Sequence, residues 1–211
     1  MNTIDNKKET IKQVAFDFFL NRGYDATTLR MICKEAHVEA PTVYYYFGSK
    51  KGLFFALIDD FWNHYNLILE SSMKTWGESP LEKLYGFYQF AINYSISHNN
   101  EIRFYLRYSL FRPIELNLDI NAHMDKTNQA KRAIIIDPIK DCIKSMYCSG
   151  NEEIAYQRYV NFIDSCTFNV IFSGWRPDNN ELLENWTVFY ENRIKSQRVG
   201  PNDALLSRLN K

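Results

Sequence analysis

The sequence has few of the residue patterns that build catalytic or metal sites. It holds four cysteines in 211 residues, and no two of them form a Cys-x-x-Cys pair of the kind found in zinc and redox sites. The four histidines stand apart, at positions 37, 64, 98 and 123. No H-E-x-x-H, G-x-S-x-G or P-loop pattern occurs. We therefore expect a protein that is not an enzyme and that needs neither a metal nor a cofactor.

Long apolar runs and an excess of charge are also missing. The sequence contains no run of eighteen apolar residues, the length that a membrane span requires, and its first residues do not resemble a signal peptide. We therefore expect a cytoplasmic protein without a membrane partner. Lysine and arginine number 25, as do aspartate and glutamate, so the formal net charge is zero. The net charge of the protein therefore provides no overall electrostatic attraction to nucleic acid.

Strand patterns are absent as well, whereas apolar residues recur at helical spacing along the chain. We predict an all-α protein of about nine or ten helices. Proline at position 138 predicts a kink or break near Asp137, and residues 114–124 are either a loop or a short helix. The predicted helices span residues 5–22, 28–36, 40–47, 50–76, 80–97, 101–110, 125–147, 152–174 and 179–196, with a short terminal helix at 202–210.

Two short predicted helices, residues 28–36 and 40–47, are separated by only three residues. Either Thr27 or Thr28 caps the first of them, because a threonine hydroxyl accepts a hydrogen bond from an amide that the helix leaves without a partner. His37 falls in the turn, and histidine is among the residues that tolerate a positive φ. The spacing predicts a helix-turn-helix.

The second short helix carries three consecutive tyrosines, Tyr44, Tyr45 and Tyr46. Helical spacing directs only Val43 and Phe47 inward, so the tyrosines face outward or flank the helix. Tyrosine hydroxyls reach phosphate oxygens, and aromatic rings and threonine methyl groups pack on thymine methyl groups. This composition is typical of a helix that lies in the major groove of DNA.

These residues resemble the TetR/AcrR family of one-component bacterial transcriptional regulators. The resemblance covers roughly residues 8–58, and His37 departs from the glycine that the family commonly has at the turn. It implies a helix-turn-helix DNA-binding domain at residues 1–50 and a larger helical domain at 51–211 for ligand binding and dimerisation. The resemblance is carried by Thr27, Thr28, Ile32, Val38, the run Thr42-Val43-Tyr44-Tyr45-Tyr46-Phe47, Ser49, Lys50 and Leu53.

The distribution of charge agrees weakly with a DNA-binding N-terminal domain. Residues 1–55 contain eight basic and six acidic residues, and the remainder contains seventeen and nineteen. Lys50 and Lys51 begin a long helix, where the helix dipole also favours a phosphate. The residues expected to contact DNA are Thr27, Thr28, Ala40, Pro41, Thr42, Tyr44, Tyr45, Tyr46 and Lys50. Of these, we expect Thr42 and Tyr45 to face bases.

The middle of the chain is rich in aromatic residues. Family members bind a small molecule within the larger domain, and aromatic rings with interspersed hydroxyls suit a hydrophobic or aromatic effector. The same stripes also suit an ordinary core, and both interpretations stay open. The ligand-binding candidates are Phe87, Tyr88, Tyr94, Phe104, Tyr105, Tyr108, Phe168 and Phe172.

The last two long predicted helices, residues 152–174 and 179–196, are more apolar than one face of a single domain requires. The family resemblance implies that they form a homodimer interface, which predicts a palindromic operator on double-stranded DNA. The resulting hypothesis is a ligand-responsive regulator, a repressor that its effector releases from the operator. The alternative is a DNA-binding activator or regulator without a small-molecule effector.

Overall fold

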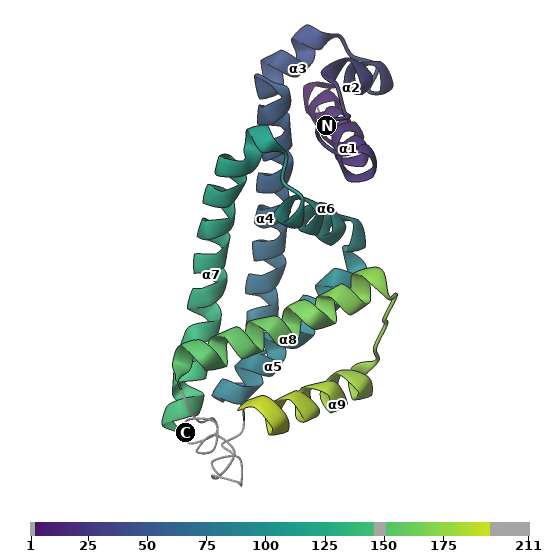
Figure 1. The fold of residues 1–211 in the computed structure, drawn as a ribbon. Coiled ribbons are helices and arrows are strands. Elements are labelled where there is room, and N and C mark those ends of the chain that lie inside the picture. The colour runs from purple at the N-terminus through teal and green to yellow at the C-terminus, as the bar shows by residue number, and fades with distance from the viewer. Residues whose placement is uncertain (1–2, 146–150, 195–211) are drawn as a thin grey trace, which may run out of the picture. The chain divides into compact units, whose positions relative to one another are not determined.

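The computed structural model describes residues 3–145 and 151–194, and within these ranges every regular element is a helix (Figure 1). The prediction of an all-α fold is confirmed. The predicted terminal helix at 202–210 lies outside the described residues.

Packing divides the chain into two compact units. Unit 1 comprises residues 1–74 and 97–128, and unit 2 comprises residues 75–96 and 129–211. The boundary predicted after residue 50 divides the chain by function, whereas these two units divide it by packing. The predicted boundary therefore stays a prediction. By packing, the N-terminal helices share one unit with a segment from the middle of the chain.

Unit 1 contains the N-terminal helices and the segment around residue 110. Its elements are α1 (Thr3–Arg22), α2 (Leu29–Glu35), α3 (Ala40–Phe47), α4 (Lys50–Met73), α6 (Asn99–Leu110), the 3-10 turn η1 (Ile114–Leu116) and the first part of α7 (Asn117–Lys144).

Local chemistry sets the ends of the N-terminal helices. Gly23 ends α1 with a φ of +89°, a conformation in which a side chain would be strained. Thr28 caps α2 by accepting a hydrogen bond from the Met31 amide. His37 turns the chain between α2 and α3 at a φ of +53°, as its position in the tight turn predicts. Ser49 caps α4 by accepting a hydrogen bond from the Gly52 amide at 2.9 Å.

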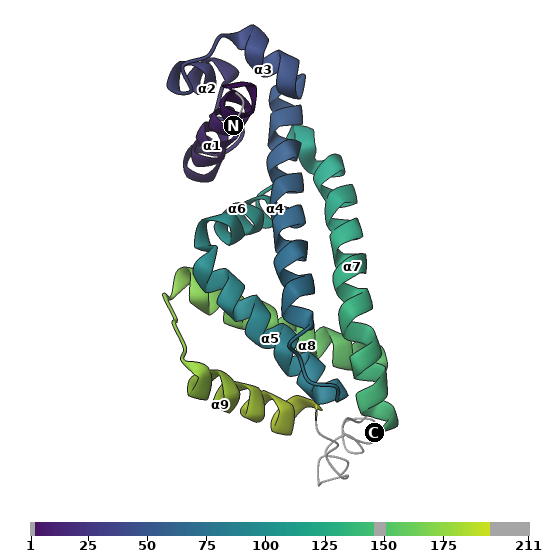
Figure 2. The ribbon, with the colours of Figure 1, turned by 180° about the vertical axis from the view of Figure 1, so that it is seen from behind.

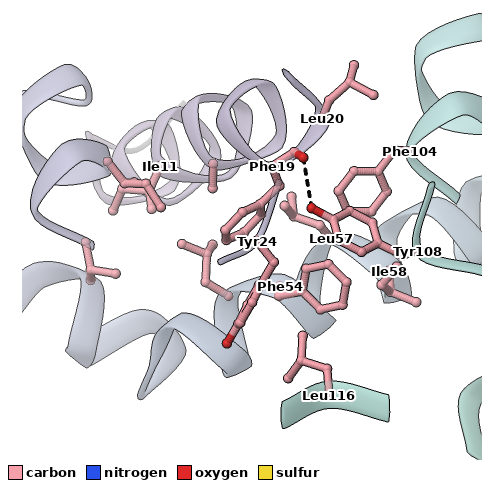
Figure 3. Packing of buried hydrophobic residues seen from close by; sticks show 14 of the residues in the cluster. Ile11, Phe19, Leu20, Tyr24, Phe54, Leu57, Ile58, Phe104, Tyr108 and Leu116 are labelled. Atoms are coloured by element: carbon pink, nitrogen blue, oxygen red, sulfur yellow. Dashed lines mark hydrogen bonds between the residues drawn. The ribbon is translucent and has the colours of Figure 1, made fainter. Parts of the chain in front are cut away.

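An aromatic cluster from α1, α4 and α6 forms the centre of unit 1 (Figure 3). Phe54 of α4 lies edge-on to Tyr108 of α6, with ring centroids 4.8 Å apart, and edge-on to Phe19 of α1 at 5.7 Å. The Tyr108 hydroxyl donates a hydrogen bond to the Phe19 carbonyl at 2.8 Å. The Arg107 guanidinium donates to the Leu20 carbonyl at 3.2 Å. These contacts attach α6 to the last turn of α1.

Unit 2 contains α5 (Pro80–Ser97), the rest of α7, α8 (Glu152–Phe172) and α9 (Asn179–Phe189), which continues as a π-helical turn, η2 (Tyr190–Ile194). Helices α8 and α9 run side by side (Figures 1 and 2), and the rings of Phe162 and Phe189 stack at 4.0 Å between them. The Tyr159 hydroxyl of α8 donates to the Leu84 carbonyl of α5 at 2.5 Å. Ring stacking therefore joins α8 to α9, and a hydrogen bond joins α8 to α5.

Helix α7 contradicts one prediction and resolves another. It runs without interruption through Pro138, so of the kink or break predicted near Asp137 the break is wrong, and the kink stays a prediction. Proline removes one backbone donor, but buried Ile135 and Ile139 on either side hold the helix in place. The ambiguous stretch at 114–124 consists of η1 and the first two turns of α7.

The hydrogen bond from Tyr108 generates a stability prediction. Burial raises the pKa of the Tyr108 hydroxyl, so the group is a neutral donor at ordinary pH. In Tyr108→Phe the Phe19 carbonyl keeps the Gly23 amide as a donor, at 3.1 Å. We therefore expect the free energy of unfolding to fall by only about 1 kcal/mol in urea denaturation. Tyr45→Phe, at a ring that is 82% exposed, is the control. Equal stability of the two variants would contradict the role of this bond.

Candidate nucleic-acid interface

Helix α3 is anchored on one side only. Val43 is fully buried and packs in the same core as Ile32 of α2 and Ala36, the C-cap of α2, while Val38 from the turn packs against that core. Because one apolar stripe attaches α3 to its neighbours, the opposite face of this short helix is left outward.

The outward face of α3 carries the predicted contact residues. Tyr45 is 82% exposed and Tyr44 is 54% exposed. Ala40 and Pro41 at the start of the helix are exposed, and Thr42 is half-buried. The helix therefore presents small side chains at its N-terminus and phenol rings further along. This order suits a helix whose first turn approaches base edges.

Tyr46 differs from the other two tyrosines. It is half-buried and packs against the core of unit 1. Its ring lies 5.1 Å from the Tyr45 ring, edge to face, and 6.0 Å from the Phe47 ring. Tyr46 therefore supports the exposed ring of Tyr45, and its own contact with DNA stays a prediction.

The two threonines before α2 have different roles. Thr27 is fully buried, and its hydroxyl donates to the Gly23 carbonyl at 2.8 Å. The structure thus corrects the expectation that Thr27 contacts DNA, since its side chain closes the turn after α1. Thr28 is exposed, and its oxygen accepts the Met31 amide at 3.3 Å. The Thr28 hydroxyl proton remains available to an acceptor such as a phosphate.

Lys50 and Lys51 begin α4 with partners that the sequence did not reveal. The Lys50 ammonium lies 4.0 Å from the centroid of the Tyr24 ring, a cation–π contact. Burial and a hydrogen bond with the Glu115 carboxylate raise the pKa of the Tyr24 hydroxyl. The Lys51 ammonium lies 2.7 Å from a carboxylate oxygen of Asp119. The segment formed by η1 and the first residues of α7, residues 114–119, therefore contacts the start of α4. We call this segment the η1–α7 corner.

The aromatic ligand candidates are divided between the two units. Phe104 and Tyr108 belong to the core of unit 1, where each is at most 2% exposed. In unit 2, Phe172 is 66% exposed and stacks on Phe168 with a centroid distance of 5.4 Å. Tyr105 lies in unit 1, and the buried candidates of unit 2 are Phe87, Tyr88 and Tyr94. Their role as ligand contacts stays a prediction.

A small cavity in unit 1 touches two of these candidates. Its volume is about 20 Å³, which is room for one water molecule and not for an aromatic effector. An effector would therefore need more space than this cavity offers. The cavity is lined by Phe55, Ile58, Trp62, Tyr105, Tyr108, Ser109 and Ile120.

The described parts of the chain contain neither a metal centre nor a membrane span. Across residues 3–145 and 151–194, no three histidine, cysteine, aspartate or glutamate side chains gather as a metal would require. None of the helices in these ranges combines the length and apolar character of a membrane span.

Comparison with known proteins identifies the N-terminal helices. Residues 11–57 match the family described as bacterial regulatory proteins, tetR family. The chain is 30% identical over 101 residues to the "Probable HTH-type transcriptional regulator YttP" of Bacillus subtilis, and 31% identical over 87 residues to the HTH-type transcriptional repressor KstR2 of Mycolicibacterium smegmatis. These stretches cover 47% and 39% of this chain and 49% and 40% of the relatives, so the chain spans about half or less of their length.

The fold is also shared with solved structures. A TetR-like transcriptional regulator from Rhodococcus sp. RHA1 superposes with a TM-score of 0.66 at 17% identity, over 88% of this chain and 92% of that one. The superposition covers nearly the whole described fold, whereas the family match rests on α1 to α4. Residues 11–57 thus form a helix-turn-helix domain of the TetR family of bacterial regulatory proteins, and the fold of the chain is similar to that of a TetR-like regulator.

Proposed function

We propose that the protein is a transcriptional regulator that binds double-stranded operator DNA through α3. The observation that carries this proposal is the outward face of α3, where Tyr44 and Tyr45 are exposed on a helix held by buried Val43. The TetR family consists of regulatory proteins rather than enzymes. The relative KstR2 is named a repressor, which favours repression over activation. A regulator of this kind acts in the cytoplasm, where its operator is.

Position along the helices divides the proposed contacts into two groups. Ala40, Pro41 and Thr42 lie in the first turn of α3, which meets base edges when the second helix of a helix-turn-helix enters the major groove. Tyr45, the most exposed of the three tyrosines, joins this group. Thr28, Tyr44 and Lys50 are assigned to phosphates, which position the protein without reading sequence.

We infer a homodimer that forms through α8 and α9. Large apolar side chains on these helices are exposed in the single chain: Ile154 at 54%, Phe172 at 66%, Leu183 at 51% and Val188 at 54%. A second copy related by a twofold axis would cover the same side chains on both partners. Such a dimer presents two α3 helices to successive major grooves, and the operator would be palindromic.

A small hydrophobic or aromatic effector is the natural ligand for the aromatic side chains of unit 2. Tyr88 combines a buried ring with a hydroxyl that accepts a hydrogen bond from the Asn185 amide at 3.2 Å. A compound that weakens operator binding would support an effector-released repressor. Operator binding that no compound relieves would favour the alternative, a regulator without an effector.

Thr42→Ala tests the proposed contact with a base. Removing the hydroxyl and methyl should relax the preference at one operator base pair by about fivefold, the lower end of what a direct base contact provides. The measurement is a competition assay over single-base variants of an operator selected from random duplexes. An equal loss on every variant would refute base reading by Thr42.

Tyr44→Phe tests the proposed contact with a phosphate. Loss of one hydrogen bond should weaken binding about threefold to tenfold on all operator variants alike. Because tyrosine carries no charge, the dependence of affinity on salt should not change. Tyr156→Phe makes the same chemical change on α8 and should leave affinity unaltered. Loss of affinity confined to one operator variant would contradict this role.

A further inference from the structure

The two lysines that begin α4 are both connected to carboxylates at the η1–α7 corner. Lys51 pairs directly with Asp119 at 2.7 Å. Lys50 lies over the Tyr24 ring, whose hydroxyl is bonded to Glu115. The carboxylates come from η1 and from the first turn of α7. All these residues lie in unit 1.

The start of α4 is where a DNA strand would lie if α3 occupied the groove. Only Gly48 and Ser49 separate the last residue of α3 from Lys50. Phosphates line both walls of the major groove, and the amide end of a helix attracts anions. Lys51, the second residue of α4, carries a side chain that is 48% exposed. Its amino group is therefore within reach of the same strand.

Lys51 differs in this respect from Lys12, another lysine of unit 1. The side chain of Lys12 is 13% exposed, and its ammonium is held by Glu9 and Asp60, each at 2.7 Å. Lys12 joins α1 to α4 and is committed to the fold. Lys51 has one identified carboxylate partner, Asp119, whose side chain is 44% exposed. Exposed pairs of this kind are weak enough for a phosphate to replace the carboxylate.

We propose that Asp119 is an autoinhibitory partner of Lys51, holding the amino group that would otherwise bind a DNA phosphate. The carboxylate also places a negative charge beside the strand, so breaking the pair strengthens DNA binding in two ways. The inference rests on the proposed function of α3. If Asp119 inhibits in this way, DNA affinity depends on the position of the η1–α7 corner, because movement of the corner away from α4 would break the ion pair and release Lys51.

Asp119→Asn is the direct test. The probe is a fluorescent duplex of random sequence, about 30 base pairs long, because binding to it depends on phosphates alone. We expect the full-length variant to bind about twofold to fivefold more tightly than wild type at about 50 mM salt, the scale of one exposed ion pair. The plot of log affinity against log salt should steepen by about 0.9, which corresponds to one added phosphate contact.

Asp164→Asn is the matched control. It makes the same substitution, raises the net charge by the same amount and removes the carboxylate of another exposed pair, Lys131–Asp164 at 3.5 Å in unit 2. Its effect measures the contribution of overall charge, which is subtracted. In the double variant Lys51→Gln/Asp119→Asn the steeper salt dependence should disappear. Thermal unfolding followed by circular dichroism verifies that each variant is folded.

The outcomes separate the two proposals. If wild type binds the duplex and Asp119→Asn binds no better than Asp164→Asn, the ion pair does not inhibit and this inference fails, while the proposed function stands. Weaker binding by Asp119→Asn would show that Asp119 positions Lys51 for DNA, which also overturns it. If the folded wild-type protein and both single variants leave the duplex unbound, the DNA-binding function itself is refuted.

Discussion

The contact between α6 and the last turn of α1 is the constraint on which unit 1 depends. A helix leaves its last four carbonyls without partners from the helix itself. In α1 the Phe19 carbonyl receives the Tyr108 hydroxyl, and the Leu20 carbonyl receives the Arg107 guanidinium. Beneath these bonds, the Phe54 ring lies edge-on to Tyr108. The helix-turn-helix is therefore one side of a larger core, closed by a segment more than eighty residues further along the chain.

This core explains how a helix as short as α3 can present a defined surface. Eight residues are too few for a stable helix in isolation. Val43 fixes α3 to the core, and α4 follows directly after Ser49. Because α4 and the η1–α7 corner also belong to unit 1, the outward face of α3 and the carboxylates of the corner are parts of the same compact unit. Any change that shifts the corner is then linked to the affinity of the surface for DNA.

Local features of the fold were predictable from the sequence because their causes are local. The predicted turn at His37 is confirmed, and the glycine that ends α1 and the Ser49 cap of α4 likewise depend on residues only a few positions apart. The bounds of α5 agree with the prediction for the same reason, since Ser79 and Glu82 cap that helix reciprocally.

Features that depend on distant parts of the chain were not predictable. Periodicity identified the aromatic stripe of α6 but not its partner, so whether Phe104 and Tyr108 line a ligand site or a core stayed open until the structure placed both in the core of unit 1. Thr27 was expected at the DNA and is buried, because only packing distinguishes it from Thr28. The pairing of Lys51 with Asp119 joins residues sixty-eight positions apart, and no spacing rule relates them.

The measurement that tests the central claim most directly is binding of the purified protein to overlapping duplexes from upstream of its own gene. Fluorescence anisotropy at about 50 mM and about 200 mM salt would separate specific binding from phosphate attraction. The account predicts tight binding to one palindromic fragment, with its advantage over the other fragments preserved at the higher salt. Equal, weak binding to every fragment would contradict sequence-specific recognition of these fragments by α3. No binding by a folded dimer would contradict a DNA-binding function.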